Sequence, residues 1–183
     1  MGVPLYAHPV ILVAGLLASS EEQMSNLVLF LNGYWDGIAE KSDCFSFSFS
    51  KYYQDELGDD PVRQYIAWNH YCDPDRIRHI KHETNTLEKL FSKKDQRLCN
   101  IDPGYLSLHQ MVLASTKPAT YRVYLGEGIY GQSTLYYKGR SFRPWPWTYK
   151  DYCQQVTIDF FNRVRKFYKR QYNFTNEDSS WQS

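Results

Sequence analysis

The residues best suited to hold a negatively charged ligand lie in one short stretch of the chain. Ser115, Thr116 and Lys117 stand together, and Arg122 follows five residues later. Hydroxyl groups and cationic side chains at neighbouring strand ends are the groups that clamp a phosphate or a carboxylate. A charged turn without a ligand explains the same residues equally well, and both interpretations stay open.

Two carboxylates are candidates for accepting a proton from a substrate. Asp102 precedes the pair Pro103-Gly104, where it either caps a turn or is presented at a strand end. Glu88 lies on a predicted helix and shares one side of it with Lys81 and Asn85. The spacing slightly favours a surface helix supported by i,i+4 pairs. In the functional interpretation Asp102 or Glu88 is catalytic, and Lys81 and Asn85 bind the ligand.

A run rich in aromatic residues precedes the last predicted helix. Residues 145–152 read Trp-Pro-Trp-Thr-Tyr-Lys-Asp-Tyr. Thr148, with Asp151 three residues later, predicts a capping box at the start of that helix. The capping box does not account for the aromatic residues, and we expect Trp147 or Tyr149 to cover a flat part of a ligand.

Sequence motifs for nucleotide and metal chemistry are missing or incomplete. Gly126-Glu127-Gly128 lacks the third glycine of a dinucleotide-binding loop, and no Gly-Lys-Ser or Gly-Lys-Thr occurs, which excludes a P-loop. His79, His82 and Glu83 have a spacing at which a helix can hold a metal ion. They match no known zinc-protease motif, and a solvated polar face explains them better. We therefore predict no metal site, and no motif identifies a cofactor.

Length and composition predict one folded unit. The chain has 183 residues, of which 43% are hydrophobic and 22% are charged. This size and composition predict a single globular domain over residues 1–172, followed by a polar and disordered tail at 173–183. The formal net charge is +1, from 21 Lys+Arg and 20 Asp+Glu. This balance weighs against a nucleic-acid partner, because phosphate binding needs clustered positive charge.

The sequence predicts a cytoplasmic protein with no membrane partner. The apolar stretch 10–18 has no Lys or Arg before it, so it does not resemble a signal peptide, and it is too short to span a bilayer. The cysteines at 44, 72, 99 and 153 include no C-x-x-C pair. We expect them to be reduced.

Hydrophobic periodicity predicts an α+β fold. The clearest helix carries the apolar stripe Ile77, Ile80, Thr84, Leu87 and Phe91. The other predicted helices begin after Ser20 and after the aromatic run, the last with Arg165 among its outer basic residues. Strands are predicted at 10–18, 45–50, 63–70, 99–102, 105–114, 121–125 and 129–137, with a turn at Pro103-Gly104. This order predicts a ferredoxin-like, split βαβ core extended by further antiparallel strands and a C-terminal helix.

Several motifs together resemble a known family. They are Phe47-Ser-Phe49 with Tyr52-Tyr53 and Glu56-Leu-Gly58, Lys81-x-x-Thr84-Asn85-x-Leu87-Glu88, Asn100-Ile-Asp-Pro-Gly-Tyr-Leu106, Leu113-Ala-Ser-Thr-Lys117, Arg122-Val-Tyr-Leu-Gly126 with Gly128-Ile-Tyr130, and Pro146-Trp-Thr-Tyr149 with Asp151-Tyr152. The chain resembles the bacterial domain-of-unknown-function family 4416 over nearly its whole length.

The resemblance supplies candidate site residues but no activity. It implies that the polar residues of these motifs belong together, namely Lys81, Asn85, Glu88, Asp102, Thr116, Lys117, Arg122 and Asp151. Members favour an acidic residue where Ser48 stands, His at Tyr121 and Glu at Gln132, so we place no general base there. Such proteins carry a GTP-binding label, which this chain does not support because it has no P-loop.

Two functions from different classes follow from these residues. The favoured one is a small-molecule site, enzymatic or sensory, in which Lys117 and Arg122 hold an anionic or phosphate-bearing ligand. The alternative is a non-catalytic interaction module that uses the aromatic segment 145–152 and the basic face of the last helix to bind a partner.

Overall fold

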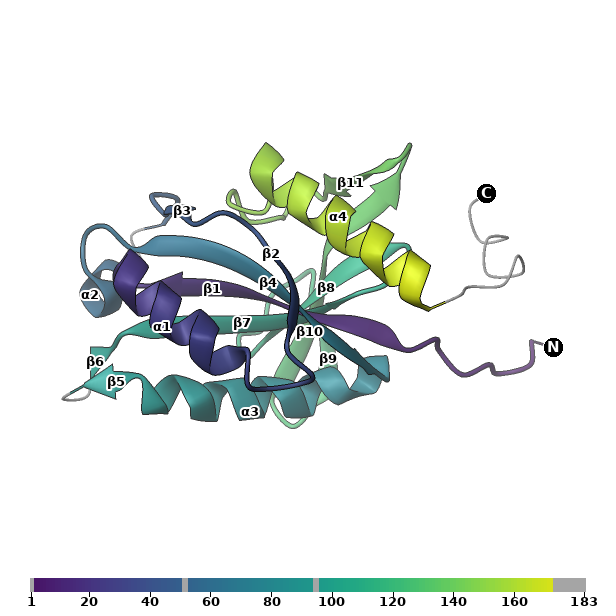
Figure 1. The fold of residues 1–183 in the computed structure, drawn as a ribbon. Helices are drawn as coiled ribbons and strands as arrows, with labels where there is room; N and C mark the ends of the chain where they lie inside the picture. Colours follow the sequence, from purple (N-terminus) through teal and green to yellow (C-terminus); the bar gives the residue numbers. More distant parts are fainter. Residues whose placement is uncertain (1, 51–52, 94–95, 173–183) are drawn as a thin grey trace.

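The computed structural model describes residues 2–50, 53–93 and 96–172, and the predicted tail at 173–183 lies outside the described residues. Helices flank a large antiparallel sheet, which confirms the α+β class (Figure 1). The elements follow in the order β1 (Val10–Ala18), α1 (Glu21–Leu31), β2 (Ile38–Lys41), β3 (Phe45–Ser46), α2 (Gln54–Leu57), β4 (Val62–Cys72), η2 (Pro74–Arg76), α3 (Ile77–Leu90), β5 (Ser92–Lys93), β6 (Gln96–Arg97), β7 (Cys99–Leu106), β8 (Gln110–Ser115), β9 (Val123–Gly126), β10 (Ile129–Lys138), β11 (Ser141–Pro144) and α4 (Gln155–Gln171).

The main sheet has the strand order β11-β10-β8-β7-β1-β4-β2, with β3 paired to β4 and β9 paired to β10. The pairings between its described strands are antiparallel. β1 lies between β7 and β4 and is buried along its whole length. The sequence prediction of a buried first strand at 10–18 is therefore confirmed.

The two faces of β1 belong to two different hydrophobic layers. Leu12 and Leu16 pack with Leu27 of α1 and Ile80 of α3, whereas Ile11 on the alternate face packs with residues of α4. Figure 1 shows α1 and α3 together on one side of the sheet and α4 on the other. Each large apolar side chain buried in this way contributes about 1.5–3 kcal/mol.

The predicted strand at 45–50 is wrong beyond its first two residues. Within the predicted strand, only Phe45–Ser46 pairs with β4. A strand that we did not predict, β2, also pairs with β4. The alternating Phe and Ser residues still have a physical explanation. Phe47 is buried against Leu17 and Leu57 in a small separate cluster, so packing rather than strand pairing explains its apolar side chain.

The predicted turn at Pro103-Gly104 is also wrong, because both residues lie inside the continuous strand β7. The turn instead falls at 107–109, and it divides the predicted strand 105–114 into the end of β7 and β8. A proline is tolerated in a strand where no partner needs its N–H. The pairing of β7 with β8 covers only residues 104–106, so Pro103 stands where the two strands have already separated.

The predicted capping box at Thr148 and Asp151 does not form. Helix α4 begins only at Gln155. Thr148 donates its hydroxyl to the Thr134 carbonyl at 2.6 Å, and Asp151 is buried against β4, so tertiary contacts use both side chains. The prediction that Arg165 lies on the outer face of the helix is also wrong. It is buried, and it donates to the Leu108 carbonyl at 2.7 Å.

Two features of the structure bear on the predicted cellular location of the protein, namely its helices and its cysteines. Within the described part of the chain, no helix is long and apolar enough to cross a membrane. The four cysteines are unpaired, and burial raises the pKa of Cys72 to about 11 and that of Cys99 to about 12. A cytoplasmic location stays a prediction.

Replacement of Gly104 by alanine tests the close approach of β7 and β8. A Cβ atom there would overlap the Val112 carbonyl oxygen and lie 3.0 Å from the Met111 side chain. Since backbone cannot move aside easily, we expect Gly104→Ala to lower the free energy of unfolding in urea by about 1–3 kcal/mol. The control is Gly33→Ala, whose new Cβ would meet only the Phe30 carbonyl at 3.4 Å. Equal stability of the two variants would contradict this account.

Candidate functional site

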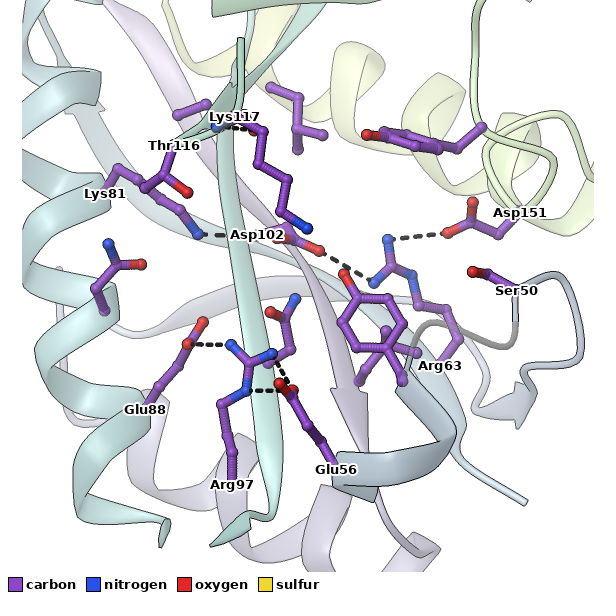
Figure 2. A pocket seen from close by; sticks show the side chains of 18 of the residues that line it. Ser50, Glu56, Arg63, Lys81, Glu88, Arg97, Asp102, Thr116, Lys117 and Asp151 are labelled. Carbon is purple, nitrogen blue, oxygen red and sulfur yellow. Dashed lines mark hydrogen bonds and ion pairs between the residues drawn. The ribbon is translucent and has the colours of Figure 1, made fainter. Parts of the chain in front are cut away.

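A pocket of about 720 Å³ lies where β7 and β8 separate (Figure 2). Strand β7 contributes Asn100 and Asp102, and the end of β8 contributes Ser115. All of the predicted site residues except Trp147 line this pocket, namely Lys81, Asn85, Glu88, Asp102, Thr116, Lys117, Arg122, Tyr149 and Asp151. The structure thus brings together residues from one helix, two strands and two loops.

Helix α3 occupies the position that β8 leaves. Lys81 donates to the carbonyl oxygen of Ile101 at 3.0 Å, and the Glu88 carboxylate accepts the N–H of Ile101 at 2.7 Å. Both backbone groups of Ile101 would otherwise lack a strand partner, because β8 pairs with β7 only from Gly104 onward. The two side chains lie two helical turns apart on one face, so the helix sequence supplies one acceptor and one donor to the strand edge.

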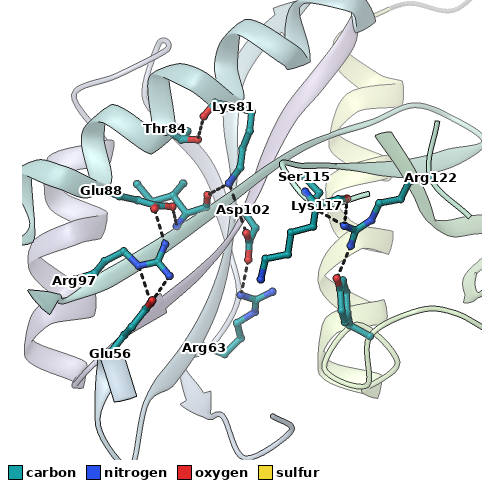
Figure 3. Close-up of polar contacts among 12 residues, drawn as sticks. Glu56, Arg63, Lys81, Thr84, Glu88, Arg97, Asp102, Ser115, Lys117 and Arg122 are labelled. Atoms are coloured by element: carbon teal, nitrogen blue, oxygen red, sulfur yellow. Dashed lines mark hydrogen bonds and ion pairs between the residues drawn. The ribbon is translucent and has the colours of Figure 1, made fainter. Parts of the chain in front are cut away.

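Glu88 therefore has a structural role. Its second oxygen accepts from Arg97 at 2.9 Å, and Arg97 also forms an ion pair with Glu56 (Figure 3). Burial raises the pKa of the Glu88 carboxyl, and the charge of Lys81 and the N–H of Ile101 oppose this shift. With both oxygens engaged, Glu88 has little capacity left to act on a substrate.

Arg63 of β4 crosses the pocket floor, and the sequence analysis did not identify it as a site residue. Its Nη2 lies 2.9 Å from the Asp151 carboxylate, which also accepts the Tyr65 hydroxyl at 2.9 Å. The guanidinium is 3% exposed, and it lies in the space that a side chain at Gly15 would fill. Asp151 is thus the buried counter-ion of Arg63, and it ties the segment before α4 to the sheet.

Asp102 differs from Glu88 in its surroundings. Its carboxylate lies 3.6 Å from Arg63 and 3.8 Å from Lys81, which is beyond hydrogen-bond distance. Among the described residues, none forms a hydrogen bond with this carboxylate. The side chain is 23% exposed, so it remains accessible from the pocket. Of the two predicted catalytic carboxylates, only Asp102 keeps oxygens available for a ligand.

Arg122 is held at the pocket rim by neutral acceptors. Its guanidinium donates to the Ser115 hydroxyl at 2.7 Å, the Lys117 carbonyl at 2.6 Å, the Gln132 amide oxygen at 2.9 Å and the Tyr149 hydroxyl at 2.5 Å. No carboxylate of the described chain lies within ion-pair distance of it. Its charge is therefore fixed in position and not neutralised. The Lys117 side chain points into the pocket toward Asp102 and Arg63 (Figures 2 and 3).

Trp147 does not line the pocket, and this corrects the expectation that it covers a flat ligand there. Its indole ring is stacked between those of Tyr121 and Trp145, at centroid distances of 5.8 and 5.2 Å. Both faces of the ring are therefore occupied by other rings. Tyr149 does line the pocket, but its hydroxyl bonds to Arg122.

The described residues contain no group of three or more His, Cys, Asp or Glu side chains placed to hold a metal ion. His79 and His82 instead face the loop at Glu127. The His79 Nδ1 lies 3.5 Å from its carboxylate, and the His82 Nε2 lies 3.0 Å from its carbonyl oxygen.

Arg63 and Arg97 line the pocket and stand in none of the motifs quoted above, whereas Glu56, Asn100 and Tyr152 stand in those motifs but were not selected as site residues. One signal was present in the sequence. Gly15 interrupts an apolar strand, and a glycine inside a strand often marks the close approach of another group. Nothing in the sequence indicated that this group is Arg63, which lies 48 positions later in the chain.

The fold and the site define an α+β protein with a charge-lined pocket at a split in its sheet. The chain belongs to the family described as domain of unknown function (DUF4416), whose model matches residues 8–168. The resemblance seen in the sequence motifs is therefore confirmed. No curated protein and no solved structure matches the chain.

The structural role of Glu88 is tested by replacement with glutamine. The amide would present a donor to either Arg97 or the Ile101 N–H, and one buried donor would lose its acceptor. We expect Glu88→Gln to lower the free energy of unfolding by about 1–3 kcal/mol. Glu83→Gln on an exposed side of the same helix should change it by less than about 0.5 kcal/mol. If both variants unfold at the same urea concentration, Glu88 does not hold β7 as described.

Proposed function

We propose that this pocket binds a small anionic molecule, one that bears a phosphate or a carboxylate. The observation that carries the proposal is the charge of the lining. Six cationic side chains and four carboxylates are found among the described residues that line the pocket. This excess contrasts with a chain whose net charge is +1. A cleft with an excess of one sign concentrates ligands of the opposite sign.

The contacts divide five of these six cations into two groups. Arg63, Lys81 and Arg97 face carboxylates and hold the framework of the pocket. The acceptors that Arg122 finds among the described residues are all neutral, and Lys117 points inward from the rim. Arg122 therefore carries a positive charge that no carboxylate of the described residues neutralises, and Lys117 places a second cation beside it. The anion would therefore lie at the end of β8, next to Lys117 and Arg122, with Thr116 close by.

One observation supports the alternative function, a non-catalytic interaction module. Tyr121 and Trp147 are 40% and 37% exposed, and the basic residues Arg163 and Lys166 lie exposed on α4. Trp147 has a stacked ring on each face, however, which leaves only its edge for a partner. The pocket has the more specific chemistry, and we favour it for that reason.

We also propose that the part of the fold formed by β1, α1, β2, β4, α3 and β7 is the ferredoxin-like core. Its strands lie in the order β7-β1-β4-β2, and α1 and α3 pack on the same face. An antiparallel sheet with two helices on one face supports that plan. In this proposal β8 to β11 and α4 extend the core and supply the second wall of the pocket.

Titration with inorganic phosphate and pyrophosphate tests the anion site. We expect binding that weakens as ionic strength rises, because charge attraction is screened by salt. Lys117→Ala should weaken it about 10- to 100-fold, as expected for loss of a hydrogen bond from a charged group. Lys166→Ala removes the same charge from an exposed position on α4 and serves as the control. Equal affinities of the two variants for both anions, measured by calorimetry, would contradict the proposed position.

A further inference from the structure

We propose that the inner part of the pocket recognises hydroxyl groups, so that the ligand is a hydroxylated anion such as a sugar phosphate or a sugar acid. This inference rests on the proposed anion site and adds the class of molecule. It comes from the polar groups at the floor of the pocket, which are of a different kind from those at the rim.

The first observation is an available acceptor. Asp102 lines the pocket, and its two ion-pair contacts are 3.6 and 3.8 Å long. Within the described residues its carboxylate accepts no hydrogen bond. A carboxylate of this kind repels a ligand phosphate, but it is a strong acceptor for a hydroxyl group. The hydroxyl-bearing part of a ligand therefore fits beside Asp102, and its anionic part fits at Lys117 and Arg122.

The second observation is a set of buried donors without acceptors. Arg63 Nε and Nη1, Asn100 Nδ2 and Tyr152 Oη find no hydrogen-bond partner within the part of the chain that the structure describes, and all three residues line the pocket. The side chains are 3%, 5% and 1% exposed. Buried donors without partners are costly, and several in one place indicate a site whose acceptors come from a bound molecule or from water.

The two observations lie on the same part of the sheet. Asn100 and Asp102 are two residues apart on β7, so their side chains project from the same face. Arg63 Nη1 lies 3.6 Å from Asp102. An amide, a guanidinium and a carboxylate together both donate to and accept from hydroxyl groups, and this combination suits neighbouring hydroxyls on one carbon chain.

Paired ligands with the same anionic group test the inference. Ethyl phosphate has no hydroxyl group on its carbon chain, whereas ribose 5-phosphate has several. We expect the wild-type protein to bind ribose 5-phosphate about tenfold or more tightly than ethyl phosphate in calorimetric titrations. Sodium gluconate, compared with sodium acetate, gives the same test with a carboxylate in place of the phosphate.

Asp102→Asn is the informative variant. The substitution removes a negative charge, so it should leave ethyl phosphate binding unchanged or tighter while it weakens ribose 5-phosphate binding. Loss of framework positioning would instead weaken both ligands together. Because Asp102 faces two cations, we expect the variant to be less stable than the wild type. Asn100→Leu, which keeps the approximate volume and removes the amide, is the second variant, with the same expected loss of preference.

The outcomes separate this inference from the proposed function. Equal affinity for ribose 5-phosphate and ethyl phosphate, with gluconate no tighter than acetate, overturns the hydroxyl subsite and leaves the anion site standing. An unchanged preference in a folded Asn100→Leu or Asp102→Asn protein also overturns it. Failure of all four compounds and of inorganic phosphate to bind overturns the proposed function itself.

Discussion

The pocket depends on a helix replacing a strand as the hydrogen-bonding partner at the edge of β7. Ile101 loses its neighbour where β8 separates from β7, and Lys81 and Glu88 of α3 take over its carbonyl and its N–H. Buried backbone groups without partners are costly, so the sheet can open at this point only because a helix supplies both contacts. A continuous β7–β8 ladder would leave no space for the pocket. The split in the sheet and the polar face of α3 are therefore parts of one arrangement.

The second constraint is the position of Arg63 across β1. Its guanidinium occupies the space above Gly15 and reaches Asp151 on the other side. A buried cation needs a paired anion, and Asp151 provides it at 2.9 Å. This pair fixes the segment before α4 against the sheet, and that segment carries Tyr149, which bonds to Arg122. The rim charge at Arg122 is in this way positioned partly by the ion pair at the floor.

The fold could be predicted from the sequence where local periodicity decides it. The buried strand β1 and the stripe on α3 follow from spacing alone, and both are confirmed. The errors share a different cause. Pro103, Thr148 and Asp151 have strong local preferences for a turn or a cap, and tertiary contacts use them instead. Most predicted site residues do line one pocket, but Arg63 was missed because a single polar residue in a strand carries no motif.

The two carboxylates that looked equivalent in the sequence differ because of what surrounds them. Glu88 accepts two hydrogen bonds, from Ile101 and from Arg97, and its charge serves the framework. Asp102 lies near two cations, Arg63 and Lys81, at distances too long for hydrogen bonds. Its charge therefore balances theirs, while its oxygens can still accept hydrogen bonds from a ligand. The Asp102 carboxylate therefore keeps its capacity to accept hydrogen bonds. That combination makes Asp102 the group through which the floor of the pocket would distinguish one anion from another, whereas Lys117 and Arg122 would attract any anion.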